Sequence, residues 1–142
     1  MSETSETLSM HPLLPESVTR AAADRRGRPH VFESFDPKKT ALVVIDLQRA
    51  FMDPGAPSEV AQARTIVPNV NRLAAALREA GGCVAWVKAT FSEAGWPIFF
   101  DHIVNPALSG RILDALQDGS ELHALYDGLD VRDGDLVVNK YR

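Results

Sequence analysis

The sequence predicts an α/β fold: a three-layer αβα, Rossmann-like parallel sheet, of which this chain carries the first three strands. Two apolar runs that end on charged residues, Asp46 and Lys140, are the first observation behind this prediction. The second is their order along the chain, because strand, helix, strand, helix, strand is typical of parallel sheets with crossover helices. The composition agrees, since 45% hydrophobic and 24% charged residues are ordinary for a globular domain.

Residues 1–35 are expected to form an amino-terminal arm or extension, because they lack periodicity and contain several prolines. A short helix is expected over residues 16–23. Residues 36–142 form the predicted domain, which begins with a turn and a first strand over residues 40–45. The continuous apolar character of that strand suits a parallel strand covered on both faces.

The later elements follow from helical spacing and turn residues. Apolar positions predict a helix over 68–80, with Pro68 in its first turn and two glycines after its end. The second strand is expected over 83–89. Asn105-Pro106 marks the start of a helix that ends near residue 117, and the third strand is expected over 135–140.

Charge and hydropathy exclude several classes of protein. The net charge is −4 and basic residues form no stripe, so we expect no nucleic-acid partner. No apolar run approaches the roughly 20 residues that a bilayer requires, so no membrane partner is expected. The amino terminus lacks the basic and apolar regions of a secretory signal, and a single cysteine suits a reducing compartment. We therefore expect a cytoplasmic protein.

Asp46 and Lys140 are the candidate catalytic residues, because chemistry gathers at the carboxyl ends of parallel strands. Taken alone, Asp46 is as readily a turn cap and Lys140 a solvated side chain. Gln48 stands where a metal-holding Asp-x-Asp motif needs its second acid, so Asp46 is interpreted as a general acid or base. Alternate strands lie about 10 Å apart, so the pair is expected to meet only if the loop carrying Lys140 folds back.

Three blocks of sequence, residues 43–48, 66–73 and 135–142, resemble the isochorismatase-like cysteine hydrolases in order and spacing. The resemblance covers about residues 36–142. It implies a six-stranded sheet with helices on both faces and an Asp–Lys–Cys triad in which Asp46 and Lys140 match the first two members. It further implies a metal-independent hydrolase that cleaves a small amide or carbamoyl C–N bond, with Asp46 taking the thiol proton.

The nucleophile of the triad is expected to lie beyond this chain, and the chain alone is expected to be inactive. Cys83, at the start of the second strand, is interpreted as a buried inert thiol. Two alternatives stay open. One is an isochorismatase-type vinyl-ether hydrolase that uses Asp46 as an acid. The other is a truncated or split polypeptide that serves only as a structural partner.

Candidate substrate-binding residues surround the pair: Gln48, Phe51, Trp96 and Tyr141. Gln48 either binds substrate or orients Asp46, and the aromatic loop 91–100 forms either a pocket wall or a subunit contact. The four histidines are scattered and residues 90–93 do not match the metal motif of the nicotinamidase branch, so neither a metal nor a cofactor is expected. The expected partners are a small-molecule substrate and either a second copy or a second chain that completes the sheet.

Overall fold

A three-stranded parallel sheet organises the computed structural model, which describes residues 15–28, 30–32, 34–92, 102 and 105–141. The chain divides into two units, Met1–Phe35 and Asp36–Arg142. The first unit contains α1 (Glu16–Arg26), which ends at Gly27 in the left-handed conformation and buries no residue. It extends three residues beyond the expected short helix.

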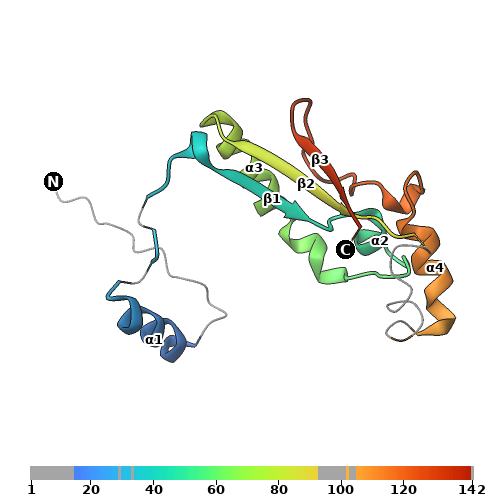
Figure 1. The fold of residues 1–142 in the computed structure, drawn as a ribbon, viewed down its shortest axis with the longest axis horizontal. Coiled ribbons are helices and arrows are strands. Elements are labelled where there is room, and N and C mark those ends of the chain that lie inside the picture. Colours follow the sequence, from blue (N-terminus) through green and yellow to red (C-terminus); the bar gives the residue numbers. More distant parts are fainter. Residues whose placement is uncertain (1–14, 29, 33, 93–101, 103–104, 142) are drawn as a thin grey trace. The chain divides into compact units, whose positions relative to one another are not determined.

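The second unit follows the predicted order of strands and helices (Figure 1). The strands β1 (Ala41–Ile45), β2 (Cys83–Ala89) and β3 (Leu136–Lys140) lie in the order β1-β2-β3, and both pairs are parallel. The helices with described bounds are α2 (Arg49–Met52), α3 (Val67–Glu79) and α4 (Pro106–Leu116), with 3₁₀ helices at Pro37–Lys39, Ala61–Ile66 and Glu121–His123. The predicted α/β class is confirmed.

The boundaries agree closely with the sequence patterns. Strand β2 has its predicted limits, α4, β1 and β3 differ from theirs by one residue at one end, and α3 is shifted by one residue at both ends. Asn105 caps α4 as expected, because its side chain accepts a hydrogen bond from the backbone N–H of Ala107 at 3.0 Å. Nothing in the apolar pattern predicted α2 or the 3₁₀ helices, which are too short to show a period.

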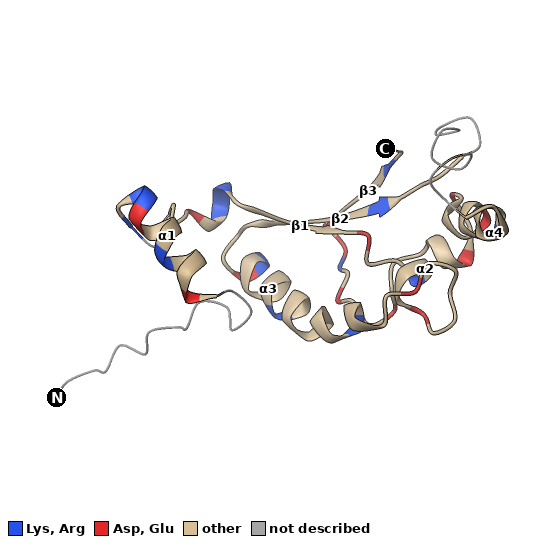
Figure 2. Ribbon diagram, turned by 90° about the horizontal axis from the view of Figure 1, so that it is seen from below, with Lys and Arg blue, Asp and Glu red and all other residues tan. Residues whose placement is uncertain are grey.

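One face of the sheet carries the main core. Helices α3 and α2 lie on this face in Figure 2. The buried residues that pack together there are Val44, Leu47, Met52, Val67, Ala74, Val84, Trp86 and Leu129. A smaller cluster of Ala50, Ala89, Ala115 and Leu116 joins α2 and α4 to the end of β2. Both clusters position the carboxyl ends of the strands.

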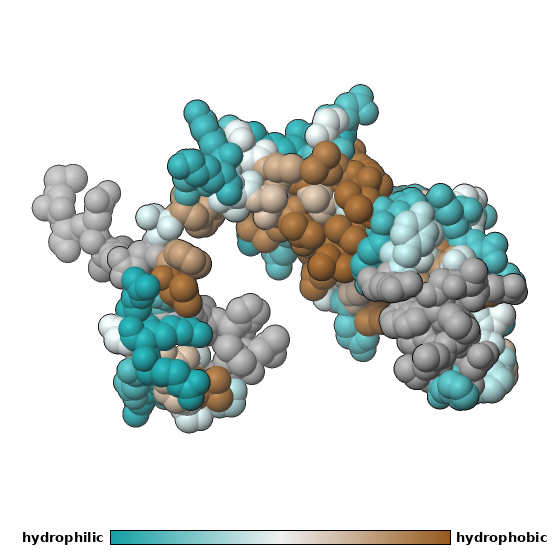
Figure 3. Space-filling model, viewed as in Figure 1, coloured by the Kyte–Doolittle hydropathy of each residue, from teal (hydrophilic) through white to brown (hydrophobic). Residues whose placement is uncertain are grey.

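The opposite face of the sheet is apolar and open in the described part of the chain. Val43 on β1 aligns with Ala85 on β2 and Leu136 on β3, and Ile45, Val87 and Val138 form the next row. Val43, Ile45, Leu136 and Val138 are each about half exposed. Figure 3 shows this face as a broad hydrophobic area over the strands.

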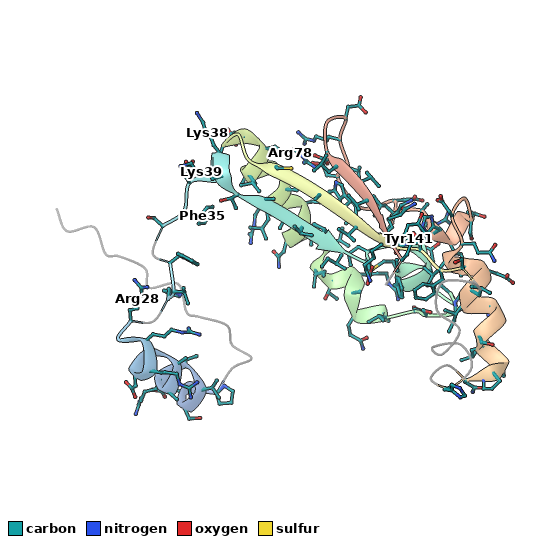
Figure 4. All side chains as sticks on the ribbon, in the orientation of Figure 1. Arg28, Phe35, Lys38, Lys39, Arg78 and Tyr141 are labelled. Atoms are coloured by element: carbon teal, nitrogen blue, oxygen red, sulfur yellow. The ribbon has the colours of Figure 1, made fainter. Side chains whose placement is uncertain are left out.

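Strand β3 is anchored at its start by a buried ion pair. Arg78 of α3 donates two hydrogen bonds to the Asp135 carboxylate, at 2.9 and 2.6 Å, and the Trp86 indole donates another at 2.8 Å. The Asp135 side chain is only 4% exposed, and the Arg78 guanidinium holds the pKa of that carboxyl well below its usual range. Figure 4 labels Arg78 and Tyr141 near opposite ends of β3. This anchor fixes the register that carries Lys140.

No helix in the described ranges is long and apolar enough to cross a membrane.

Candidate active site

Asp46 follows the last residue of β1 and has an unusual backbone. Its φ of 61° makes it the non-glycine residue with a positive φ in the described chain. A regular strand residue at this position would point to the same face as Val44, which is buried against α3. The left-handed conformation ends that alternation and re-aims the carboxylate. Such strain in a non-glycine residue is found where the surrounding structure imposes it, often at functional sites.

Lys140 meets Asp46 directly. Its Nζ lies 3.1 Å from Asp46 Oδ2, and the two side chains are 36% and 33% exposed. Lys140 is the last residue of β3 and pairs with Ala89, so the expectation that a folded-back loop must carry it is wrong. The four-carbon stem of the lysine extends far enough to reach past the end of β2 to the residue that follows β1.

The second carboxylate oxygen of Asp46 is buried and has no hydrogen-bond partner among the described residues. Lys140 contacts Oδ2, so one oxygen holds the carboxylate in place. The other oxygen is buried and lacks a hydrogen-bond partner among the described residues; we call it the open oxygen. Buried polar atoms are nearly always hydrogen-bonded, and an exception calls for an explanation. An acceptor left open beside a fixed ammonium is suited to take a proton from a group that approaches it.

Gln48 is completely buried and bonds to the backbone. Its Nε2 donates to the carbonyls of Ala89 and His123, each at 3.0 Å, and its Oε1 accepts from the Ala89 N–H at 2.7 Å. These bonds join the end of β2 to the segment around His123. Gln48 follows Asp46 by two positions in the sequence, but its side-chain amide bonds to the main chain. A role of Gln48 in substrate binding stays a prediction.

His123 is a buried polar residue that the sequence analysis did not select. Its side chain is 2% exposed, its Nε2 lies 2.8 Å from Thr90 Oγ1, and its Nδ1 lies 3.3 Å from Lys88 Nζ. Because an ammonium can only donate, Nδ1 accepts and the proton of the neutral ring lies on Nε2. Burial, together with the charge of Lys88, lowers the pKa of His123, although Asp118 opposes this shift.

Thr90 connects this buried cluster to the pair formed by Asp46 and Lys140. Its backbone N–H donates to the carbonyl of Lys140 at 2.8 Å, while its hydroxyl contacts His123. The one sign of this cluster in the sequence was the charged Lys88 inside an otherwise apolar strand. Its partner, His123, is 35 residues away along the chain. Such a contact depends on tertiary structure and has no periodic pattern.

A cleft of about 500 Å³ opens beside the end of β3. Its lining residues are Thr90, Phe91, Ser92, Gln117, Asp118 and Tyr141. Tyr141, one of the predicted substrate-binding residues, is 55% exposed. Phe51, another of them, is partly buried against the small core cluster that includes Ala89. Trp96 and the rest of residues 93–100 of the aromatic loop lie outside the described residues.

Cys83 lies at the far end of the sheet from Asp46. It is the first residue of β2, whereas Asp46 lies near the carboxyl end of that strand, where its N–H donates to the carbonyl of Val87. The intervening residues of an extended strand place the two roughly 15 Å apart. Cys83 is partly rather than fully buried. Among the described residues, no group of three or more His, Cys, Asp or Glu gathers as a metal site.

Comparison with known proteins adds a family match. A family model described as the isochorismatase domain matches residues 40–142. A solved cysteine hydrolase from Pseudomonas syringae pv. phaseolicola 1448A has a TM-score of 0.68 and 22% identity, covering 80% of this chain and 51% of that one.

Two further solved structures share the fold. An isochorismatase family protein from Desulfovibrio vulgaris subsp. vulgaris str. Hildenborough has a TM-score of 0.54 and 27% identity, covering 72% of this chain and 52% of that one. An N-carbamoylsarcosine amidase from Thermoplasma acidophilum has a TM-score of 0.55 and 19% identity, covering 71% and 51%. The chain thus spans about half the length of the solved structures it matches.

Proposed function

The chain belongs to the isochorismatase family, and from that premise we propose that it carries the acid–base half of a metal-independent cysteine hydrolase. The substrate class of this proposal is a small amide or carbamoyl compound, cleaved at its C–N bond. The single observation that carries the proposal is the geometry of Asp46, which has one oxygen on Lys140 at 3.1 Å and the other buried and open.

The chemistry assigns a separate task to each residue. Asp46 accepts the proton of a cysteine thiol through its open oxygen, and the resulting thiolate attacks the substrate carbonyl. The ammonium of Lys140 stabilises the negative charge that moves between the carboxylate and the thiolate. Asp46 then returns the proton to the leaving nitrogen, and water releases the acid from the thioester.

The nucleophile of this mechanism is not Cys83, which is the single cysteine of the sequence and lies at the other end of β2. The proposal therefore requires a cysteine from outside residues 1–142, and it predicts that this chain by itself does not turn over an amide. The open apolar face of the sheet supports the idea that a further segment or chain packs there.

A vinyl-ether hydrolase of the isochorismatase type is the second candidate. The observation in its favour is that Asp46 and Lys140 are in place while the nearest cysteine is remote. In that reaction Asp46 acts as an acid and no thiol is required. A non-catalytic structural partner is the third candidate, and it assigns no task to the open oxygen of Asp46.

One assay separates these candidates. The assembled enzyme is incubated with a panel of primary amides and carbamoyl compounds, and ammonia release is measured before and after alkylation with iodoacetamide. The cysteine hydrolase predicts ammonia release that alkylation abolishes. Release of pyruvate from isochorismate that survives alkylation would favour the vinyl-ether reaction, and no turnover of either class would favour the structural partner.

A further inference from the structure

The described residues that line the cleft beside Tyr141 include one acidic residue and no basic residue. Among its six lining residues, Asp118 carries the formal charge, and the others supply hydroxyl, amide and aromatic groups. No lysine or arginine is among the described residues that line it. A pocket with this lining attracts a cation or a neutral hydrogen-bond donor more strongly than an anion.

Asp118 is presented to the cleft by a defined turn. The N–H of Ser120 donates to the carbonyl of Gln117 at 3.1 Å, and Gly119 has a φ of 85°, a conformation that glycine adopts without strain at the third position of a type II turn. Asp118 is therefore the second residue of this turn. Its side chain is 66% exposed, and Oδ1 lies 3.5 Å from His123 Nδ1. The turn fixes the backbone of Asp118, the neutral His123 ring does not pair with its carboxylate, and the carboxylate is accessible to a ligand.

Two lysines of the described residues, Lys140 and Lys88, are engaged in contacts of their own. Lys140 lies against Asp46, and Lys88 donates to the buried ring of His123. Burial and the charge of Lys88 lower the pKa of His123, so this ring is neutral at physiological pH and adds no positive charge. The charge of Lys88 weakens the attraction of Asp118 for a cation, but Lys88 is not part of the lining.

Two aromatic residues complete the cleft. Phe91 packs against the small core cluster, and Tyr141 is 55% exposed beside it in the lining. The face of an aromatic ring attracts an ammonium group, and a nearby carboxylate adds to that attraction through its opposite charge. A hydroxyl from Ser92 and an amide from Gln117 add hydrogen-bonding groups.

We propose that this cleft binds a basic nitrogen, so that the preferred substrate is a small amide or carbamoyl compound that also carries an ammonium group. The inference rests on the proposed hydrolase function, because it places the ammonium at Asp118 and the scissile carbonyl toward Asp46. Asp118 and Tyr141 are then the residues that determine specificity, and they take no part in bond cleavage.

Three ligands of nearly equal shape test this proposal. In 4-aminobutanamide, pentanamide and succinamate the same primary amide ends in an ammonium, a methyl and a carboxylate group. Their binding to the assembled enzyme is measured by ligand-observed NMR, which does not depend on turnover. We expect 4-aminobutanamide to bind about fivefold more tightly than pentanamide, the size of one exposed ion pair. Succinamate is expected to bind most weakly.

Two substitutions locate the preference. Asp118→Asn removes the charge from an exposed turn and is expected to eliminate the fivefold preference, while Asp118→Lys reverses it toward succinamate. Asp114→Asn is the matched control, because Asp114 lines a different cleft with Asp53 and Arg111. It should leave the order unchanged.

The outcomes separate this inference from the proposed function. Equal binding of the three amides, an order that survives Asp118→Asn, or no binding of any of them would overturn the ammonium site. Ammonia release without a charge preference would retain the hydrolase and reject the ammonium site. A charge preference that depends on Asp118, without ammonia release from any amide, would support the ammonium site and count against the proposed reaction.

Discussion

At the scale of single residues, the position of Asp46 was predictable and its conformation was not. An aspartate at the end of an apolar strand indicates a site at the sheet edge, and a lysine at the end of another strand indicates its counterpart. The positive φ of Asp46 and its direct contact with Lys140 depend on how the strands pack. The residues next to Asp46 in the sequence carry no pattern that predicts either feature. Sequence reasoning therefore placed the two residues at one edge but required a loop movement that does not occur.

Gln48 is a residue near the site for which the sequence left two tasks open, substrate binding and orientation of Asp46, while its observed hydrogen bonds all go to the backbone. We predict that Gln48→Leu lowers the free energy of unfolding by about 3 kcal/mol, because the N–H and C=O of Ala89 and the C=O of His123 lose their buried partners. Chemical denaturation monitored by tryptophan fluorescence measures this loss.

Gln62→Leu is the control for that substitution, because Gln62 is exposed and its side chain has no such bonds. It should leave the stability nearly unchanged. If Gln48→Leu left stability intact and raised KM alone, Gln48 would be a substrate-binding residue, as the sequence analysis allowed.

At the scale of elements, the register of β3 is set by one ion pair. We predict that Arg78→Met lowers the free energy of unfolding by about 3 kcal/mol, because it leaves the carboxylate of Asp135 buried without its charged partner. Urea denaturation gives the value. Arg72→Met, an exposed change on the same helix, should have no measurable effect, and equal effects of the two substitutions would contradict the role of the ion pair.

The buried His123 makes stability depend on pH. Its pKa is lower in the folded protein than the ordinary value of 6.5, so below pH 6.5 the unfolded chain binds a proton that the folded chain resists. The contribution of His123 to the free energy of unfolding is therefore at its maximum above pH 6.5. It is lost as the pH falls from 6.5 toward the lower pKa of the folded state. We predict that the thermal midpoint falls between pH 7 and pH 5 and that His123→Gln flattens this slope.

His30→Gln is the control for this pH dependence, because His30 is exposed. It should reproduce the slope of the unmodified protein. An unchanged slope in His123→Gln would mean that other groups titrate in this range. The depressed pKa of Asp135 acts in the same direction but only below about pH 4, so the two contributions can be measured apart.

The longer elements were predictable because their periods are long enough to be recognised. Strand β2 and helices α3 and α4 have four or more apolar positions at regular spacing, and their ends are marked by glycine, proline or asparagine. The short helix α2 and the 3₁₀ helix at Glu121–His123 lack such spacing. They are held by tertiary bonds such as those of Gln48, so they could not be derived from local pattern.

At the scale of the whole molecule, the open face of the sheet governs association. We predict that residues 1–142 made alone self-associate, because half-exposed apolar residues form two aligned rows across the strands. Sedimentation velocity over a range of concentrations tests this prediction. Val43→Lys combined with Val138→Lys should reduce association, whereas Leu73→Lys, equally exposed on α3, should not. A monodisperse monomer at every concentration would contradict it.

The central claim is that Asp46 is the acid–base residue of a hydrolase, and Asp46→Asn tests it most directly. Asparagine tolerates the left-handed conformation, so the fold should be retained, as circular dichroism can verify. We predict that ammonia release by the assembled enzyme falls at least about a hundredfold, the usual contribution of a general base. Asp127→Asn, an exposed change, should leave the rate unaltered. A near-normal kcat in Asp46→Asn would contradict the account.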